Sequence, residues 1–260
     1  MAKSEAIEKV EKKQELGSPL DFTQHAGQGL EDVGMGDLAT PFLSILEALS
    51  PQVNKKKDAY IEGAEVGRIL NVATQELYDE MDLIVAYKEK YIVEWVPRDA
   101  GGGFVALHPY NPELLKGCKR DDRNNMVNVE GNHMVETQYY FCLQLNEDHT
   151  DGEFVLLSMS KSRLKSARIL NGLIKKKIPD HPQKAEYPSF AHIIKVTTEN
   201  IERNGTDYHI WSPSYKGLVQ NQYVFDKANQ LYTEAFNKII QVGPPPTDEL
   251  PVVEGENTAF

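Results

Sequence analysis

The middle of the chain carries the hydrophobic pattern of β-strands. In residues 81–88, one set of alternate positions holds Met, Leu, Val and Tyr, which is the period of a strand with one buried face. Apolar runs at 91–96, 104–107, 137–143 and 154–157 predict further strands. The pattern therefore indicates a mainly β domain with antiparallel neighbours.

Two more segments extend this pattern. Residues 192–197 and 208–211 predict a hairpin, because the Asn204-Gly205 dipeptide between them favours a tight turn. Residues 41–46 form the first apolar core segment. So short a run is compatible with either a strand or a helix.

Two segments have the 3.6-residue period of amphipathic helices. The first runs from Ser160, a residue type that caps helices, to about Lys176. The second runs from about Gln222 to Gln241, and three prolines at 244–246 stop it. The apolar stripes are Leu164, Ala167, Leu170, Leu173 and Ile174 in the first helix and Val224, Ala228, Leu231, Ala235 and Ile239 in the second.

The composition divides the chain into a core and two ends. Residues 1–37 are charged and poor in large apolar side chains, which predicts a mobile N-terminal arm. Residues 38–243 form a single core domain, and 244–260 form a disordered acidic tail. For the core we expect an α+β fold, mainly β: an OB-like antiparallel barrel with an inserted basic helix and a C-terminal helix. Other α+β arrangements fit the same pattern.

The cysteines and the apolar segments indicate where the protein acts. Cys118 and Cys142 have no CxxC spacing, so we expect reduced thiols rather than a zinc site. The first residues lack the apolar region of a signal peptide, and no run of eighteen apolar residues would span a membrane. These features predict a cytoplasmic protein without membrane contact.

Catalytic motifs are missing. Gly101–Gly103 lies between two strands and lacks the Gly-Lys-Ser that completes a phosphate-binding loop, so it is interpreted as a loop or hairpin. Asp79, Glu80 and Asp82 are close in sequence, but a divalent ion needs oxygens from separate elements. We expect no enzyme, no cofactor and no metal. A metal-dependent nuclease or other DNA-processing enzyme that uses these acids stays open as an alternative.

The charge is unevenly distributed. The 260 residues carry a formal charge of −11, from 39 acidic and 28 basic side chains, which at face value argues against a nucleic-acid partner. However, residues 161–195 hold nine basic and two acidic side chains. Such a local field can follow phosphates even on an acidic protein, although it is also compatible with a solvated helix face. The predicted phosphate-binding residues are Lys161, Lys165 and Arg168, and Lys175 and Lys176 are further candidates for DNA contact.

Aromatic residues lie next to cations elsewhere in the chain. A flat ring beside a cation can stack a base and hold its phosphate without reading sequence. The alternative is that these rings belong to the core, as strand aromatics often do. Tyr91, Trp95 and Trp211 are the predicted stacking residues, and the other candidates for DNA contact are Lys88, Lys90, Arg98, Tyr140, Tyr215 and Lys216.

The tail combines four acidic residues with a terminal ring. An acidic tail can occupy a basic groove until DNA displaces it, and a ring beside the α-carboxylate is a compact anchor for a partner's pocket. The alternative is a tail kept for solubility. The predicted partner-binding residues are Asp248, Glu249, Glu254, Glu256 and Phe260.

With Asp248-Glu249 and Glu254–Phe260 at the end of a β-rich core, the chain resembles the single-stranded-DNA-binding proteins of bacteriophages. The resemblance implies an OB core that coats single strands during DNA replication and recombination in the host cytoplasm. It also implies a tail that contacts the phage polymerase or helicase–primase. A homodimer stays open, as does a third function, that of a phage interaction or virion-associated protein whose aromatics are simply core.

Overall fold

The computed structural model describes residues 25, 28–30, 39–181, 183–203 and 205–246. The chain forms two compact units, Met1–Leu38 and Ala39–Phe260. In the first unit the described residues form a turn, in which the Gln28 amide donates to the His25 carbonyl at 3.1 Å. The predicted arm, 1–37, and the tail, 244–260, fall mostly outside the described residues.

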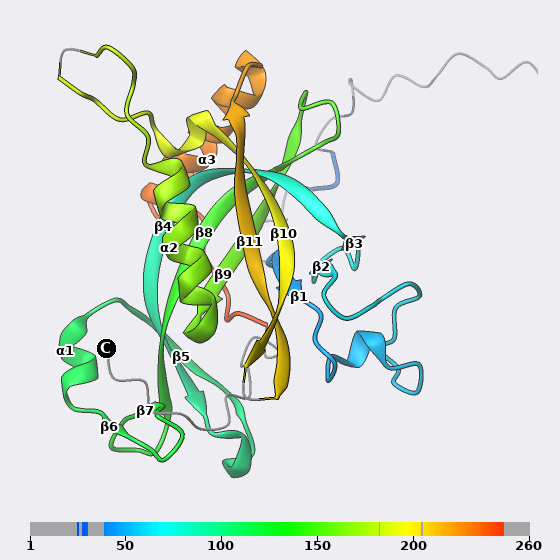
Figure 1. Ribbon diagram of the computed structural model, residues 1–260, viewed down its shortest axis with the longest axis vertical. Coiled ribbons are helices and arrows are strands. Elements are labelled where there is room, and N and C mark those ends of the chain that lie inside the picture. The colour runs from blue at the N-terminus through cyan, green and yellow to red at the C-terminus, as the bar shows by residue number, and fades with distance from the viewer. Residues whose placement is uncertain (1–24, 26–27, 31–38, 182, 204, 247–260) are drawn as a thin grey trace, which may run out of the picture. The chain divides into compact units, whose positions relative to one another are not determined.

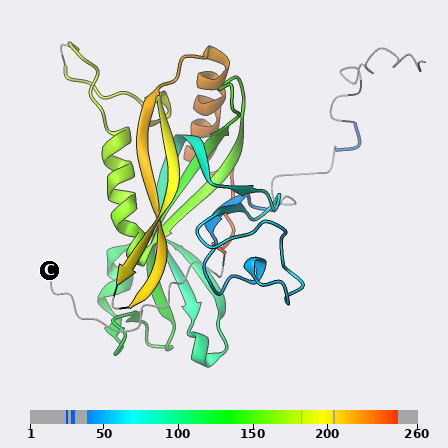
Figure 2. The same cartoon turned by 45° about the vertical axis from the view of Figure 1, so that its right-hand side comes forward.

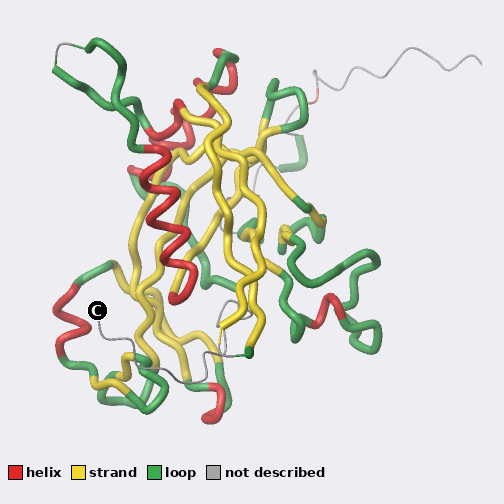
Figure 3. Tube along the Cα trace, viewed as in Figure 1, coloured by secondary structure: helices red, strands yellow, loops and turns green. Residues whose placement is uncertain are grey.

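The second unit is built around an eleven-stranded sheet (Figure 1). The strands follow the order β11-β10-β4-β8-β9-β1-β2-β3, with β5 beside β4 and with β6 and β7 joined to β8. The tube in Figure 3 shows how far strands outweigh helices. The strands are β1 (Phe42–Ile45), β2 (Ile69–Asn71), β3 (Leu77–Tyr78), β4 (Glu80–Val96), β5 (Gly103–Pro109), β6 (Lys119–Arg120), β7 (Met126–Val127), β8 (His133–Leu145), β9 (Gly152–Ser160), β10 (His192–Arg203) and β11 (Thr206–Leu218).

Among the described residues, three α-helices and several short 3-10 helices accompany the sheet. None of the helices in the described part of the chain is long and apolar enough to cross a membrane. The α-helices are α1 (Pro112–Lys116), α2 (Leu164–Ile174) and α3 (Gln222–Phe236), and the 3-10 helices are η3 (Pro51–Val53), η4 (Arg98–Ala100), η5 (Lys161–Arg163) and η6 (Ser189–Ala191).

The predicted mainly β, largely antiparallel core is confirmed. The short run at 41–46 forms strand β1, which pairs in parallel with β9 and antiparallel with β2. The sheet curls into a half-barrel, and its strand order runs in a line through the described residues without returning from β3 to β11.

The β1–β2 connection reaches across to the β10–β11 hairpin. The Thr198 hydroxyl donates to the Gly67 carbonyl at 2.5 Å, and the His209 amide donates to Glu47 at 3.1 Å. Gly67 has φ +90°, and a Cβ there would lie 2.8 Å from the His209 ring. Glycine is therefore needed where the two ends of the sheet approach.

Strand β4 runs through the middle of the sheet and joins two predicted strands. Residues 81–88 and 91–96 form one continuous strand of 17 residues, because Glu89 and Lys90 continue its pairing with β8. Ala86 is an extra residue in this pairing, between Val85 and Tyr87. Such a bulge bends a strand and increases its twist, as a curled sheet requires.

Both faces of the sheet are buried. Leu83 and Val85 pack in a cluster with Ala167 and Leu170 of α2, a face that we call the α2 side. Ile84 packs in a second cluster with Ala228 of α3, the α3 side. Figure 2 shows the two helices on opposite sides of the strands. The prediction that 81–88 has a single buried face is therefore wrong, because each face is covered by its own helix.

Both predicted helices exist, with different ends. Ser160 is the last residue of β9 and makes no side-chain capping bond, so the predicted cap is wrong. The α-helix begins after the 3-10 turn η5. Helix α3 starts at the predicted place, where the Asn221 side chain accepts from the amides of Tyr223 and Val224. It ends at Phe236, before the prolines, and Lys238 already has φ +60°.

Candidate nucleic-acid interface

The outward face of α2 is basic and exposed. The apolar stripe of the helix packs against the sheet, as its period predicts, which turns Lys165 and Arg168 to solvent. Neither side chain makes an ion pair or hydrogen bond with any residue that the structure describes. Lys175, which follows the helix, is also exposed, and its Nζ lies 3.9 Å from Glu186. These cations are available to an anionic ligand.

The end of α2 meets the end of β11. The Nζ of Lys176 lies 3.0 Å from the ring centroid of Tyr215, which is 36% exposed. Behind Tyr215 lies His192, whose ring is fully buried and meets the Tyr215 ring at 61° with centroids 5.8 Å apart. Burial, together with the Lys176 charge, lowers the pKa of His192. A cation and an exposed ring thus stand together beside the basic helix face.

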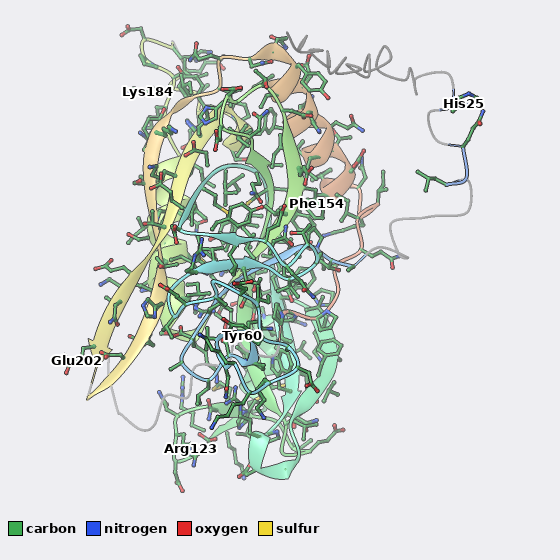
Figure 4. All side chains as sticks on the ribbon, turned by 90° about the vertical axis from the view of Figure 1, so that its right-hand side faces the viewer. His25, Tyr60, Arg123, Phe154, Lys184 and Glu202 are labelled. Atoms are coloured by element: carbon green, nitrogen blue, oxygen red, sulfur yellow. The ribbon has the colours of Figure 1, made fainter. Side chains whose placement is uncertain are left out.

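The acidic residues of the β10–β11 hairpin lie at the other end of the hairpin. Glu199 and Glu202 are exposed near its tip, and Figure 4 shows Glu202 far from Lys184, which belongs to the loop after α2. The basic residues after α2 are therefore separated from these two carboxylates by the length of the strands.

A second group of predicted residues lies where β4 nears its end. Lys90 is paired with Glu136 at 3.1 Å and stands over the Tyr110 ring at 4.8 Å. Burial lowers the pKa of Lys161, whose Nζ donates to Asn125 at 3.2 Å. Burial also lowers the pKa of Lys88, and Lys90 adds to the effect. Arg98 is exposed and interacts electrostatically with Lys161. Lys88, Lys90 and Lys161 are therefore more enclosed than the cations of α2.

The structure corrects the expected exposure of three aromatic rings. Trp95 is 2%, Trp211 1% and Tyr140 0% exposed, so none presents a face to solvent. The physical reason is the double burial of the sheet: Trp211 and Tyr140 face α2, and Trp95 packs with Phe104. Tyr91 is half-buried, donates to Glu89 at 2.6 Å and packs on Tyr139.

Three of the cations near these surfaces are already paired with carboxylates of the fold. The Arg163 side chain is buried and pairs with Glu47 at 3.2 Å, and Lys195 pairs with Glu80 at 2.5 Å. The predicted DNA contact Lys216 donates to Asp82 at 2.5 Å. These three residues are engaged within the fold. The role of the other predicted residues in DNA binding stays a prediction.

The acidic residues of the nuclease alternative are held in ion pairs. Asp79 pairs with Arg68 at 2.8 Å, and Asp82 accepts from His149 at 2.7 Å as well as from Lys216. Burial alone would raise the pKa of Asp82, but these hydrogen bonds lower it. In the described part of the chain, no three His, Cys, Asp or Glu side chains are grouped so that they could hold a metal ion.

A buried carboxylate was missed by the sequence reasoning. Glu94, in β4, accepts from Asn128 at 2.8 Å, from Asn132 at 2.7 Å and from His108 at 2.8 Å. The hydrogen bond from Asn132 is the largest influence that lowers its pKa. The sequence signal that could have identified it is the position of Glu94 as the single acidic residue within the apolar run Val93–Val96. The carboxylate ties the polar 109–132 segment to the sheet.

The predicted partner-binding residues, Asp248, Glu249, Glu254, Glu256 and Phe260, lie outside the described residues. Among known protein families, the one described as Pam3 phage gp34-like protein matches residues 10–240. No curated protein and no solved structure matches the chain.

Proposed function

We propose that this chain, which belongs to the Pam3 phage gp34-like protein family, is a non-enzymatic single-stranded-DNA-binding protein. It acts without sequence preference in phage DNA replication or recombination, in the cytoplasm of the host cell. It needs no cofactor, and its curled sheet serves as the OB-like core. The acidic tail competes with DNA for the basic face and, once released, contacts the phage polymerase or helicase–primase.

The exposed, unpaired cations of α2 carry the proposal. Lys165 and Arg168 have no partner among the described residues, whereas Lys227 of α3 is paired with Asp151 at 2.7 Å. Free cations that follow one helix face bind a phosphate backbone by releasing its counterions, which makes binding strongly dependent on salt. Tyr215 supplies a ring beside them, and base stacking on a ring tolerates any sequence.

The test is a salt titration of oligonucleotide binding by the full-length chain. Because both tryptophans are buried, their fluorescence is a poor reporter, and anisotropy of a dye-labelled oligothymidylate is the better measurement. In the double variant Lys165→Ala/Arg168→Ala, we expect weaker binding. The slope of log K against log salt should decrease by about 1.4, at about 0.7 for each phosphate contact.

The matched control is the double variant Lys227→Ala/Lys238→Ala, which removes two cations beside α3 that are already paired with carboxylates. It should bind like the wild type. Absence of wild-type binding at low salt would overturn the proposal. An equal loss in both double variants would show a general charge effect rather than a site on α2.

The burial of Trp95 and Trp211 favours a second candidate, a phage interaction or virion-associated protein whose aromatic residues serve the core. The same titration separates the two. A protein of this second kind has no salt-dependent affinity for oligothymidylate.

A further inference from the structure

Tyr215 has the surroundings of a stacking platform that is covered in the free protein. The buried His192 ring packs on the Tyr215 ring at an interplanar angle of 61°, with centroids 5.8 Å apart. His192 also packs on Tyr187, at 78° and 5.6 Å. Tyr215 is thus held against the fold but remains 36% exposed, and Lys176 lies over its ring.

The backbone of Lys176 is hydrogen-bonded, whereas its ammonium group contacts only an aromatic ring among the described residues. Its carbonyl accepts from the Tyr187 amide at 2.9 Å, and the next residue, Lys177, bridges to Glu186. Its ammonium has no ion pair or hydrogen bond among the described residues, only the ring of Tyr215. The backbone is therefore anchored while the side chain is free to change partner.

We propose that Tyr215 and Lys176 form a single-nucleotide subsite that works by exchange. The base of a bound strand takes the place of the ammonium on the Tyr215 face, and Lys176 moves onto the phosphate of the same nucleotide. This inference rests on the proposed function and specifies how one part of that interface operates.

The exchange is favourable on physical grounds. The cation–π contact of one exposed ammonium is weaker than the charge-assisted hydrogen bond that the same ammonium forms with a phosphate. The uncovered ring then gains a base, and stacking on an aromatic ring is a main source of affinity for single strands. Lys175 and Lys177 are exposed on either side of Lys176, so the adjoining phosphates also meet cations.

The first test is substitution of the ring. Tyr215→Leu should weaken oligothymidylate binding about fivefold to 150-fold, the range for loss of one stacked base, and Tyr215→Phe should retain the affinity. The matched control is Tyr223→Leu on α3. Tyr223 is also exposed and also has a lysine over its ring, Lys227 at 5.9 Å, but Lys227 is committed to Asp151. This control should bind like the wild type.

The second test follows Lys176 itself by NMR. In the free protein its side-chain methylene protons next to Nζ should be shifted upfield by the ring current of Tyr215, and oligonucleotide should remove this shift. Lys175 is the reference. If wild-type protein binds DNA while the Lys176 signals stay upfield, or if Tyr215→Leu binds normally, the subsite is refuted and the proposed function stands. If wild-type protein does not bind, both are refuted.

Discussion

The two long helices make the same contact with the sheet and differ in what they present to solvent. Each packs a buried apolar stripe, Ala167 and Leu170 in α2 and Ala228 and Leu231 in α3. On α3 the lysine is neutralised by a carboxylate from the β8–β9 turn, whereas Lys165 of α2 has no such partner among the described residues. The apolar stripe of a helix thus predicts only how the helix packs. Whether a lysine on its outer face is available to a ligand depends on whether a carboxylate of a neighbouring element pairs with it.

The same contrast holds for the two aromatic–cation pairs. Lys176 lies 3.0 Å from the Tyr215 centroid and binds no carboxylate among the described residues. Lys227 lies 5.9 Å from the Tyr223 centroid while bound to Asp151. A lysine that already has a carboxylate gains little from a phosphate. The α2 side is therefore the side on which ligand binding can change the partner of a cation.

The largest expected effect is a loss of stability on substitution of Arg163, the buried cation of the basic segment 161–195, whose other cations include the exposed Lys165 and Arg168. Arg163→Ala should lower the free energy of unfolding by about 2–3 kcal/mol, because it leaves Glu47 without its buried partner. A quarter of the Glu47 side chain is exposed, so the loss should stay below the ~3–5 kcal/mol of a fully buried pair. Urea unfolding measures it.

Arg168→Ala is the control for this experiment, since the same type of residue is exposed five residues further along. It should change the free energy of unfolding by no more than about 0.5 kcal/mol. Similar losses in the two variants would contradict the division of the basic segment into structural and available cations.

A smaller effect is expected at the start of α3, the helix that has a side-chain cap. Asn221→Ala removes the acceptor for the amides of Tyr223 and Val224 and should cost about 1 kcal/mol in urea unfolding. Asn229→Ala, at an exposed position within the same helix, should be neutral or slightly stabilising. No loss at Asn221 would mean that packing alone fixes the helix, as it does for the uncapped α2.

The smallest effect concerns pH and belongs to the α2 side. Burial and Lys176 lower the pKa of His192 below its ordinary value of 6.5. The unfolded chain therefore takes up this proton at a higher pH than the folded chain, and the free energy of unfolding falls as the pH drops below about 6.5. His192→Phe should reduce the fall in Tm between about pH 7.5 and pH 5.

His133 has a pKa that is lowered by burial, so it keeps part of the acid sensitivity in the variant. A His192→Phe profile that overlays the wild type would show that His192 does not titrate differently in the two states.

Local pattern was enough to predict the long strands and the two long helices, because each has a periodic or continuous apolar segment. The short elements β2, β3, β6, β7 and α1 have no such segment and were not predicted. The division between the strands predicted at 81–88 and 91–96 was wrong, because the two apolar runs are separated only by the charged residues Glu89 and Lys90, which continue the strand. In the fold they are satisfied by their neighbours: the Tyr91 hydroxyl donates to Glu89, and Lys90 pairs with Glu136.

The candidate site was predictable in part. The cations of α2 follow from helical periodicity, so Lys165 and Arg168 were placed correctly on the outward face. The burial of Trp211 was not predictable, because it depends on α2 covering that face of the sheet from a distant part of the sequence. The pairing of Arg163 with Glu47 is equally long-range, and no local signal distinguishes Arg163 from Arg168.

The parallel pairing of β1 with β9 has a consequence for how the protein is made. Phe42 and Leu43 find their β9 partners only at Leu156 and Leu157, about 110 residues later. At the speed of ribosomal synthesis this is a delay on the order of ten seconds, during which the apolar strand β1 cannot pair with β9. The emerging chain is therefore most exposed to aggregation and to chaperones before β9 is synthesised, and a nascent chain that stops short of β9 has no partner for the β9 side of β1.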